Sequence, residues 1–159
     1  MSAEEAALIE RFYSAFARRD GDEMAACYTA DATFSDEVFV DLRGNAVGSM
    51  WRMLCSRGED LKVEHSGVRA EDGLGRAHWD AWYTFVATGR PVHNSIDAEF
   101  RFRDGLISQH RDRFDFWRWS RQALGPVGLI AGWSPPLRAK VRGQAREQLD
   151  RFMAERSAG

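Results

Sequence analysis

Four long runs between residues 61 and 119 constrain the fold more than any other part of the chain. They are rich in the β-branched and aromatic residues typical of strands, and they span residues 61–72, 76–89, 90–105 and 106–119. Glycine-containing turns separate them, at Asp72-Gly73, Thr88-Gly89 and Asp104-Gly105. Aspartate followed by glycine suits the tight turns of hairpins. The pattern therefore predicts a meander of long antiparallel strands.

Helical patterns precede and follow these strands. Residues 2–24 open with a serine cap signal and acidic residues, and their apolar side chains recur at helical spacing. Residues 22–28 and 43–58 are predicted as two further helices, the second ending at Gly58, and residues 31–40 as a strand. A last helix after two prolines carries one apolar stripe, made by Val141, Ala145, Leu149 and Phe152 or Met153.

Three helices followed by a curved antiparallel sheet predict an α+β fold. Helices packed on the concave face of such a sheet make a cone with a pocket inside. A chain of 159 residues is expected to form one domain with a proper core.

Composition excludes several classes of function. The net charge is −2 and basic residues are interspersed with acidic ones, so no nucleic-acid partner is expected. No apolar stretch is long enough to cross a bilayer and no targeting pattern opens the chain, which predicts a cytoplasmic protein without a membrane partner. Cys27 and Cys55 lack CxxC spacing and are expected to be free thiols.

The stretch 109–116, QHRDRFDF, places polar side chains on an aromatic face. In a strand, alternate residues share a face, so His110 and Asp112 lie on the same side as Phe114 and Phe116. The opposite side carries two arginines and suits water. A histidine and an aspartate on the apolar side need a reason, because a buried carboxylate is costly without a partner.

Two segments resemble the NTF2-like superfamily, which includes ketosteroid isomerases, SnoaL-type polyketide cyclases and limonene-epoxide hydrolases. They are FYSAFARRDGDEMAACYTADATFSD near the start and FRFRDGLISQHRDRFD near the end. The resemblance implies the cone fold for residues 1–124, with residues 125–159 as a C-terminal loop and helical extension of the same domain. It also implies a homodimer formed through the sheet.

Residue-by-residue comparison with the ketosteroid isomerases matches only one of three groups. Asp36 falls where those enzymes keep the carboxylate that shuttles a proton. Their oxyanion-hole tyrosine falls on Phe12, with Tyr13 one residue off, and their oxyanion-hole aspartate falls on Ala98. Steroid isomerisation by that mechanism is therefore not expected. The His-x-Asp of the last strand is more similar to the SnoaL-type cyclases, whose terminal strand carries an acid–base aspartate.

We therefore expect three catalytic residues, Asp112, Asp36 and His110, inside the cone. The substrate-binding walls are expected to be Phe12, Phe34, Trp82 and Phe114. Burial would let two carboxylates in one apolar cavity act as acid and base. The structural alternatives remain open: Asp112 pairs with His110 or an arginine, Asp36 satisfies a turn, and His110 is a hydrogen-bonded core residue.

The strand at residues 76–89 has two candidate faces. His78, Asp80 and Trp82 share one, opposite Trp79 and Tyr83. His78-x-Asp80 together with Asp112 would partly resemble the Arg-x-Asp group of epoxide hydrolases, but the arginine is absent. Alternatively, the other face lines the pocket, and His78 and Asp80 lie on the outer surface.

The expected function is a SnoaL-like enzyme that performs acid–base chemistry of the isomerase or cyclase type on a hydrophobic small molecule, without a cofactor or a metal. No histidine pair has metal-ligand spacing. The alternative is a non-catalytic ligand-binding or dimeric assembly module, and a lesser one is epoxide hydrolysis. The stretch 114–119 is expected to be a strand end that serves as an interface or as a stacking platform. The stretch 125–136 is expected to be a loop that covers the cone or packs against a neighbour.

Overall fold

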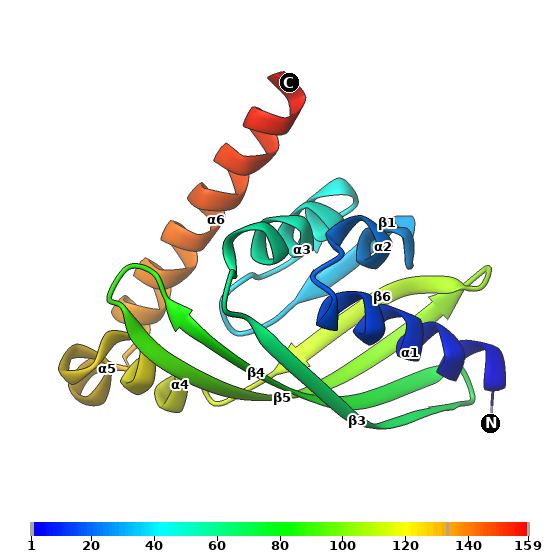
Figure 1. The fold of residues 1–159 in the computed structure, drawn as a ribbon, viewed down its shortest axis with the longest axis horizontal. Helices are drawn as coiled ribbons and strands as arrows, with labels where there is room; N and C mark the ends of the chain where they lie inside the picture. The colour runs from blue at the N-terminus through cyan, green and yellow to red at the C-terminus, as the bar shows by residue number, and fades with distance from the viewer. Residues whose placement is uncertain (1, 133, 159) are drawn as a thin grey trace.

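The computed structural model describes residues 2–132 and 134–158 and contains one six-stranded sheet (Figure 1). The elements in chain order are α1 (Ala3–Ala17), α2 (Gly21–Ala26), β1 (Tyr28–Ser35), β2 (Leu42–Arg43), α3 (Asn45–Arg57), β3 (Lys62–Glu71), β4 (Leu74–Phe85), β5 (Arg90–Arg103), β6 (Leu106–Arg113), α4 (Phe116–Leu124), α5 (Pro126–Ala131) and α6 (Pro135–Ala158). The strand order is β2-β1-β6-β5-β4-β3.

The predicted antiparallel meander is confirmed. Strands β3 to β6 pair in sequence order, each antiparallel to the next, while β1 lies parallel to β6. The two Asp-Gly turns adopt left-handed backbone angles at both residues, with φ of 53° and 76° at Asp72-Gly73 and 54° and 77° at Asp104-Gly105. Glycine and aspartate tolerate this conformation, and its twist matches the flanking strands.

Helices α1 and α3 cover the concave face of the sheet (Figure 1). Phe16 of α1 lies 5.1 Å, centroid to centroid, from both Trp51 of α3 and Trp79 of β4. The approach of α1 depends on Gly75, since a Cβ atom there would lie 2.8 Å from Ile9 and 2.7 Å from Phe102. The aromatic residues of the chain thus form a core between helices and sheet.

The last strand ends earlier than the sequence pattern predicts. β6 stops at Arg113, and residues 116–124 form α4 instead of continuing the strand to residue 119. Asp115 caps this helix, accepting a hydrogen bond from the Arg118 N–H at 3.1 Å. Phe116 and Trp119 would lie on opposite faces of a strand, but here they share one helical face and pack with Ala123.

Helix α4 takes the place of a strand beside β5. Pairing between β5 and β6 covers β5 only from Asp97 onward. Before that point, the Gln122 amide accepts from the His93 N–H at 2.7 Å and donates to its carbonyl at 3.1 Å. The expected loop at 125–136 also contains a short helix, α5, although Trp133 lies outside the described residues.

Helix α6 returns past α3 (Figure 1), and the stripe predicted from sequence makes the contact. Leu149 is fully buried, and Ala145, Phe152 and Met153 are partly buried against the main core. Near the start of the helix, Arg142 donates from Nε to the Glu37 carbonyl at 3.0 Å. In the part of the chain that the structure describes, no helix is long and apolar enough to cross a membrane.

These contacts predict that the C-terminal extension unfolds together with the rest of the domain. Leu149→Ala should lower the free energy of unfolding by roughly 2–5 kcal/mol, because the deletion leaves a cavity in the core. Leu129→Ala, at a half-exposed leucine of α5, is the control and should change it by no more than about 0.5 kcal/mol. Urea denaturation followed by fluorescence and circular dichroism measures both. Two separate transitions in the parent protein would contradict a single unit.

Candidate active site

A histidine and an aspartate form a buried pair on the concave face of β6. The His110 side chain has 0% and the Asp112 side chain 1% of its surface exposed, and His110 Nε2 lies 2.8 Å from Asp112 Oδ1. Strand periodicity explains the placement, because both residues point to the side that α1 and α3 cover. Both expected residues thus lie inside the cone, and the pairing left open by the sequence is present.

The pair continues into a chain of hydrogen bonds that reaches α3. The Tyr28 hydroxyl lies 2.6 Å from His110 Nδ1, and Trp51 Nε1 donates to the same hydroxyl at 2.8 Å. Burial raises the pKa of Tyr28 well above its ordinary value, so the hydroxyl keeps its proton. An indole N–H can only donate, so the Tyr28 proton is free to point at Nδ1. His110 then donates from Nε2 to Asp112.

Aromatic rings enclose the histidine on several sides. The ring of Phe100 stacks on His110 at 4.3 Å between centroids, and those of Phe34 and Phe12 meet it edge-on at 4.9 and 5.6 Å. Phe12 and Phe34, two of the expected walls, therefore lie beside the catalytic candidates. Water has little access here, which strengthens the electrostatic effect of each hydrogen bond.

Three buried polar atoms near this chain have no hydrogen-bond partner among the described residues: Tyr13 Oη, Trp79 Nε1 and Asp112 Oδ2. The rings of Tyr13 and Trp79 lie 6.3 Å apart. Burial, with a further contribution from the charge of Asp112, raises the pKa of Tyr13 well above its ordinary value. Unpaired buried polar atoms are rare in folded proteins, and a bound ligand is one of the partners that accounts for them.

Asp36 lies just beyond the end of β1 and closes a turn. Its Oδ1 accepts from the N–H groups of Val38 at 2.7 Å and Phe39 at 2.6 Å, as the turn alternative anticipates. Burial raises the pKa of Asp36 to about 7, although these two hydrogen bonds oppose the shift. The parallel register pairs Phe34 with His110, so Asp36 follows β1 at the level where Asp112 follows His110 on β6.

Trp82 does not line the cone, contrary to the expected substrate-binding set. Its ring stacks on His93 at 4.5 Å, with Lys62 over it at 5.4 Å, on the convex face of the sheet. Strand β4 presents Trp79 to the core, so Trp82, three residues further on, points the other way. Phe114 follows the end of β6 and packs, partly buried, against both core clusters.

His78 and Asp80 share the convex face with Trp82. His78 contacts Asp97 at 2.9 Å, and Asp80 contacts His93 at 2.9 Å. The sheet separates both from Asp112, so the three residues that would resemble the epoxide hydrolase group do not come together. Within residues 2–132 and 134–158, no three His, Cys, Asp or Glu side chains are arranged to hold a metal ion.

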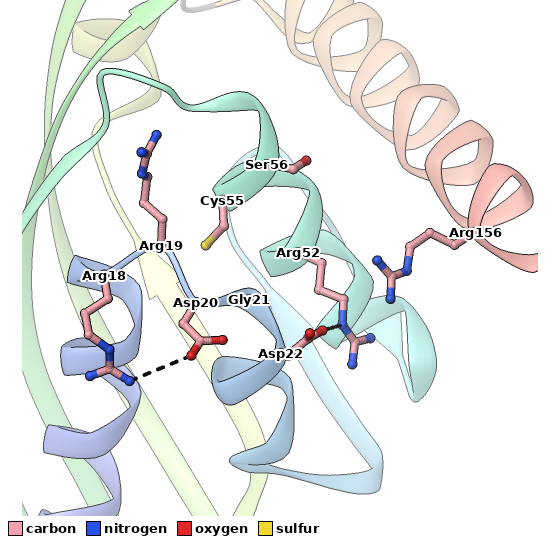
Figure 2. A pocket seen from close by; sticks show the side chains of 9 residues that line it. All are labelled: Arg18, Arg19, Asp20, Gly21, Asp22, Arg52, Cys55, Ser56 and Arg156. Carbon is pink, nitrogen blue, oxygen red and sulfur yellow. Dashed lines mark hydrogen bonds and ion pairs between the residues drawn. The ribbon is translucent and has the colours of Figure 1, made fainter. Parts of the chain in front are cut away.

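A surface hollow of about 530 Å³ lies between the turn after α1, the helix α3 and the end of α6 (Figure 2). Its lining residues are Arg18, Arg19, Asp20, Gly21, Asp22, Arg52, Cys55, Ser56 and Arg156. Asp22 binds Arg52 at 2.7 Å, and the Gly58 carbonyl accepts from Arg19 at 2.9 Å. None of these residues belongs to the buried hydrogen-bond chain, so the hollow is separate from the candidate site.

The SnoaL-like domain family matches residues 9–110, more than half of the chain, from within α1 to His110 in β6. The chain belongs to the SnoaL-like family. No curated protein matches it.

Several solved structures share the fold. An LEH-like epoxide hydrolase from M. tuberculosis is 21% identical, with 81% of this chain and 96% of that one covered and a TM-score of 0.61. A proposed polyketide cyclase from Silicibacter sp. TM1040 is 21% identical, with coverage of 75% and 94% and a TM-score of 0.64. An NTF2-like protein from Burkholderia pseudomallei K96243 is 15% identical, with coverage of 76% and 98% and a TM-score of 0.65. At these identities the likeness establishes the NTF2-like α+β fold.

The sequence of this SnoaL-like chain did not point to two of the four further polar groups in the site. Tyr28 and Trp51 join His110 only because β1 lies beside β6 and α3 crosses above, which no local pattern reveals. Tyr13 and Trp79 carried a signal. Trp79 lies on the alternative inner face of its strand, and Tyr13 adjoins Phe12 on a helix where both side chains are buried.

The raised pKa of Asp36 predicts a specific pH dependence of stability. The folded protein favours the protonated carboxyl, while the unfolded chain releases this proton near pH 4. Stability from Asp36 is therefore fully present below about pH 4 and is lost as the pH rises to about 7. Asp36→Asn keeps the Oδ1 acceptor and removes the titration. Its melting temperature should rise relative to the parent between pH 4 and 7.

Thermal melts across this pH range measure the difference. Asp150→Asn, at an exposed carboxylate of α6, is the control and should follow the parent profile. Parallel profiles for the parent and Asp36→Asn would show that Asp36 does not titrate in this way.

Proposed function

We propose that this chain is a cofactor-free acid–base enzyme of the isomerase or cyclase type, which acts on a hydrophobic small molecule inside the cone. One observation carries the proposal: Asp112 is buried, His110 holds one of its oxygens, and the other oxygen has no hydrogen-bond partner among the described residues. A carboxylate oxygen left unpaired in an aromatic core is costly, and a proton-transfer site gives a reason to keep it.

The geometry supports different roles for Asp112 and His110. Asp112 Oδ2 takes a proton from a carbon next to a carbonyl group, and the same oxygen can return it to another carbon. His110 donates to Oδ1 and stabilises the carboxylate while it is charged. Tyr28 and Trp51 hold the imidazole ring in place, so they act through His110 and not on the substrate.

Asp36 suits a second proton-carrying role. A carboxyl whose pKa is near 7 exchanges its proton readily at neutral pH. Both backbone hydrogen bonds to Asp36 use Oδ1, and neither uses Oδ2. In this proposal, Asp112 removes the proton and Asp36 supplies or receives one at the other end of the substrate.

The test uses 2-tetralone, a neutral aromatic ketone with acidic protons beside its carbonyl, dissolved in D2O. The parent should catalyse exchange of these protons, measured by proton NMR. Asp112→Asn should lower the exchange rate by about 10²–10⁴-fold, the usual contribution of a general base, while binding changes little. Asp97→Asn, on the neighbouring strand and the opposite face, is the matched control and should exchange at the parent rate.

Two results would contradict the enzyme. Equal exchange by the parent and Asp112→Asn would remove Asp112 from the chemistry. Binding of the ketone by the parent without any exchange would identify a ligand-binding module instead.

A further inference from the structure

Two of the three unpartnered atoms in the cone are hydrogen-bond donors. The indole N–H of Trp79 can only donate, and the protonated phenol of Tyr13 can donate as well. The third atom, Asp112 Oδ2, accepts while the carboxyl is ionised. The interior therefore offers a ligand two donors and one acceptor that the described residues do not use.

The sheet register places small side chains between these groups. Asp112 of β6 lies opposite Ala98 of β5, and Ala98 lies opposite Ala77 of β4. Trp79 is the next residue of β4 on the same face. In this row of the sheet, the intervening strand β5 places only the small side chain of Ala98 beside Asp112, while Ile96 pairs with Trp79. Helix α1 brings the Tyr13 ring to 6.3 Å from the Trp79 ring.

The charges of the core favour a neutral ligand. The buried polar or charged residues among those described are Ser49, His110, Asp112 and Ser120, so the set includes no lysine or arginine. A carboxylate or phosphate next to Asp112 would place two negative charges in a poorly solvated space without a cation to offset them. The ligand must still carry an acceptor, because the N–H of Trp79 requires one.

We propose that Tyr13 and Trp79 form a subsite for the carbonyl oxygen of a neutral ketone or aldehyde, whose acidic C–H faces Asp112 Oδ2. This inference rests on the proposed acid–base function. The C–H bond breaks, its proton forms an O–H bond with Oδ2, and the electron pair moves onto the carbonyl oxygen. The two donors stabilise the resulting enolate, and return of the proton to carbon restores a neutral carbonyl compound.

Indole N–H signals in ¹⁵N-labelled protein report directly on the subsite. The chain has six tryptophans, and Trp79→Phe and Trp82→Phe assign the two needed signals by their absence. Addition of 2-tetralone should shift the Trp79 signal downfield and leave that of Trp82, on the convex face, unchanged. The anionic analogue 2-naphthoate at the same concentration should shift neither. No shift of Trp79 with the ketone, or an equal shift with 2-naphthoate, would overturn the subsite.

Exchange rates separate this inference from the function on which it rests. Tyr13→Phe and Trp79→Phe each remove one donor and keep an aromatic ring, and each should slow the exchange of 2-tetralone at least 10-fold. Trp82→Phe is the matched control and should exchange at the parent rate. If Asp112→Asn abolishes exchange while both donor variants retain the parent rate, the acid–base function stands and the subsite is wrong. If Asp112→Asn retains the parent rate, the acid–base function itself fails.

Discussion

The hydrogen bond between His110 and Asp112 is the constraint on which the rest of the site depends. Phe12, Phe34 and Phe100 enclose His110, and the Asp112 side chain beside it is buried. The carboxylate therefore has little water to solvate its charge and needs a donor held in a fixed place. His110 is that donor, and its own position is fixed from the other side by Tyr28. The polar chain therefore leaves one oxygen of Asp112 buried and without a hydrogen-bond partner in the part of the chain that the structure describes.

The fold supplies the conditions for this arrangement from distant parts of the chain. Helix α1 brings an aromatic layer, α3 brings Trp51, and the parallel strand β1 brings Tyr28 to the last strand. The C-terminal helices close the same core, since Trp119 donates to the Tyr83 hydroxyl at 2.8 Å and Arg142 holds the backbone at Glu37, beside Asp36. The C-terminal segment is thus packed beside Asp36, one end of the proposed proton path.

The sequence predicts the sheet well because strand alternation and Asp-Gly turns are local signals. It also places His110 and Asp112 on the inner face, for the same reason. It fails at residues 114–119, where an alternating aromatic pattern competes with the Asp115 cap and the spacing of Phe116, Trp119 and Ala123. The prediction that Trp82 lines the cone is wrong for a different reason. Alternation shows which residues of the strand share a face but not which face is buried, and the packing of Trp79 against Phe16 decides this.

The direction of the hydrogen-bond chain is the central claim, and ¹⁵N NMR of the His110 ring tests it most directly. If Trp51 donates to Tyr28 and Tyr28 donates to His110, then Nδ1 carries no proton and Nε2 carries one that points at Asp112. The coupling pattern of the ring should show this tautomer in the parent protein. A proton on Nδ1 in place of Nε2 would reverse the chain, deprive Asp112 of its donor and contradict the account.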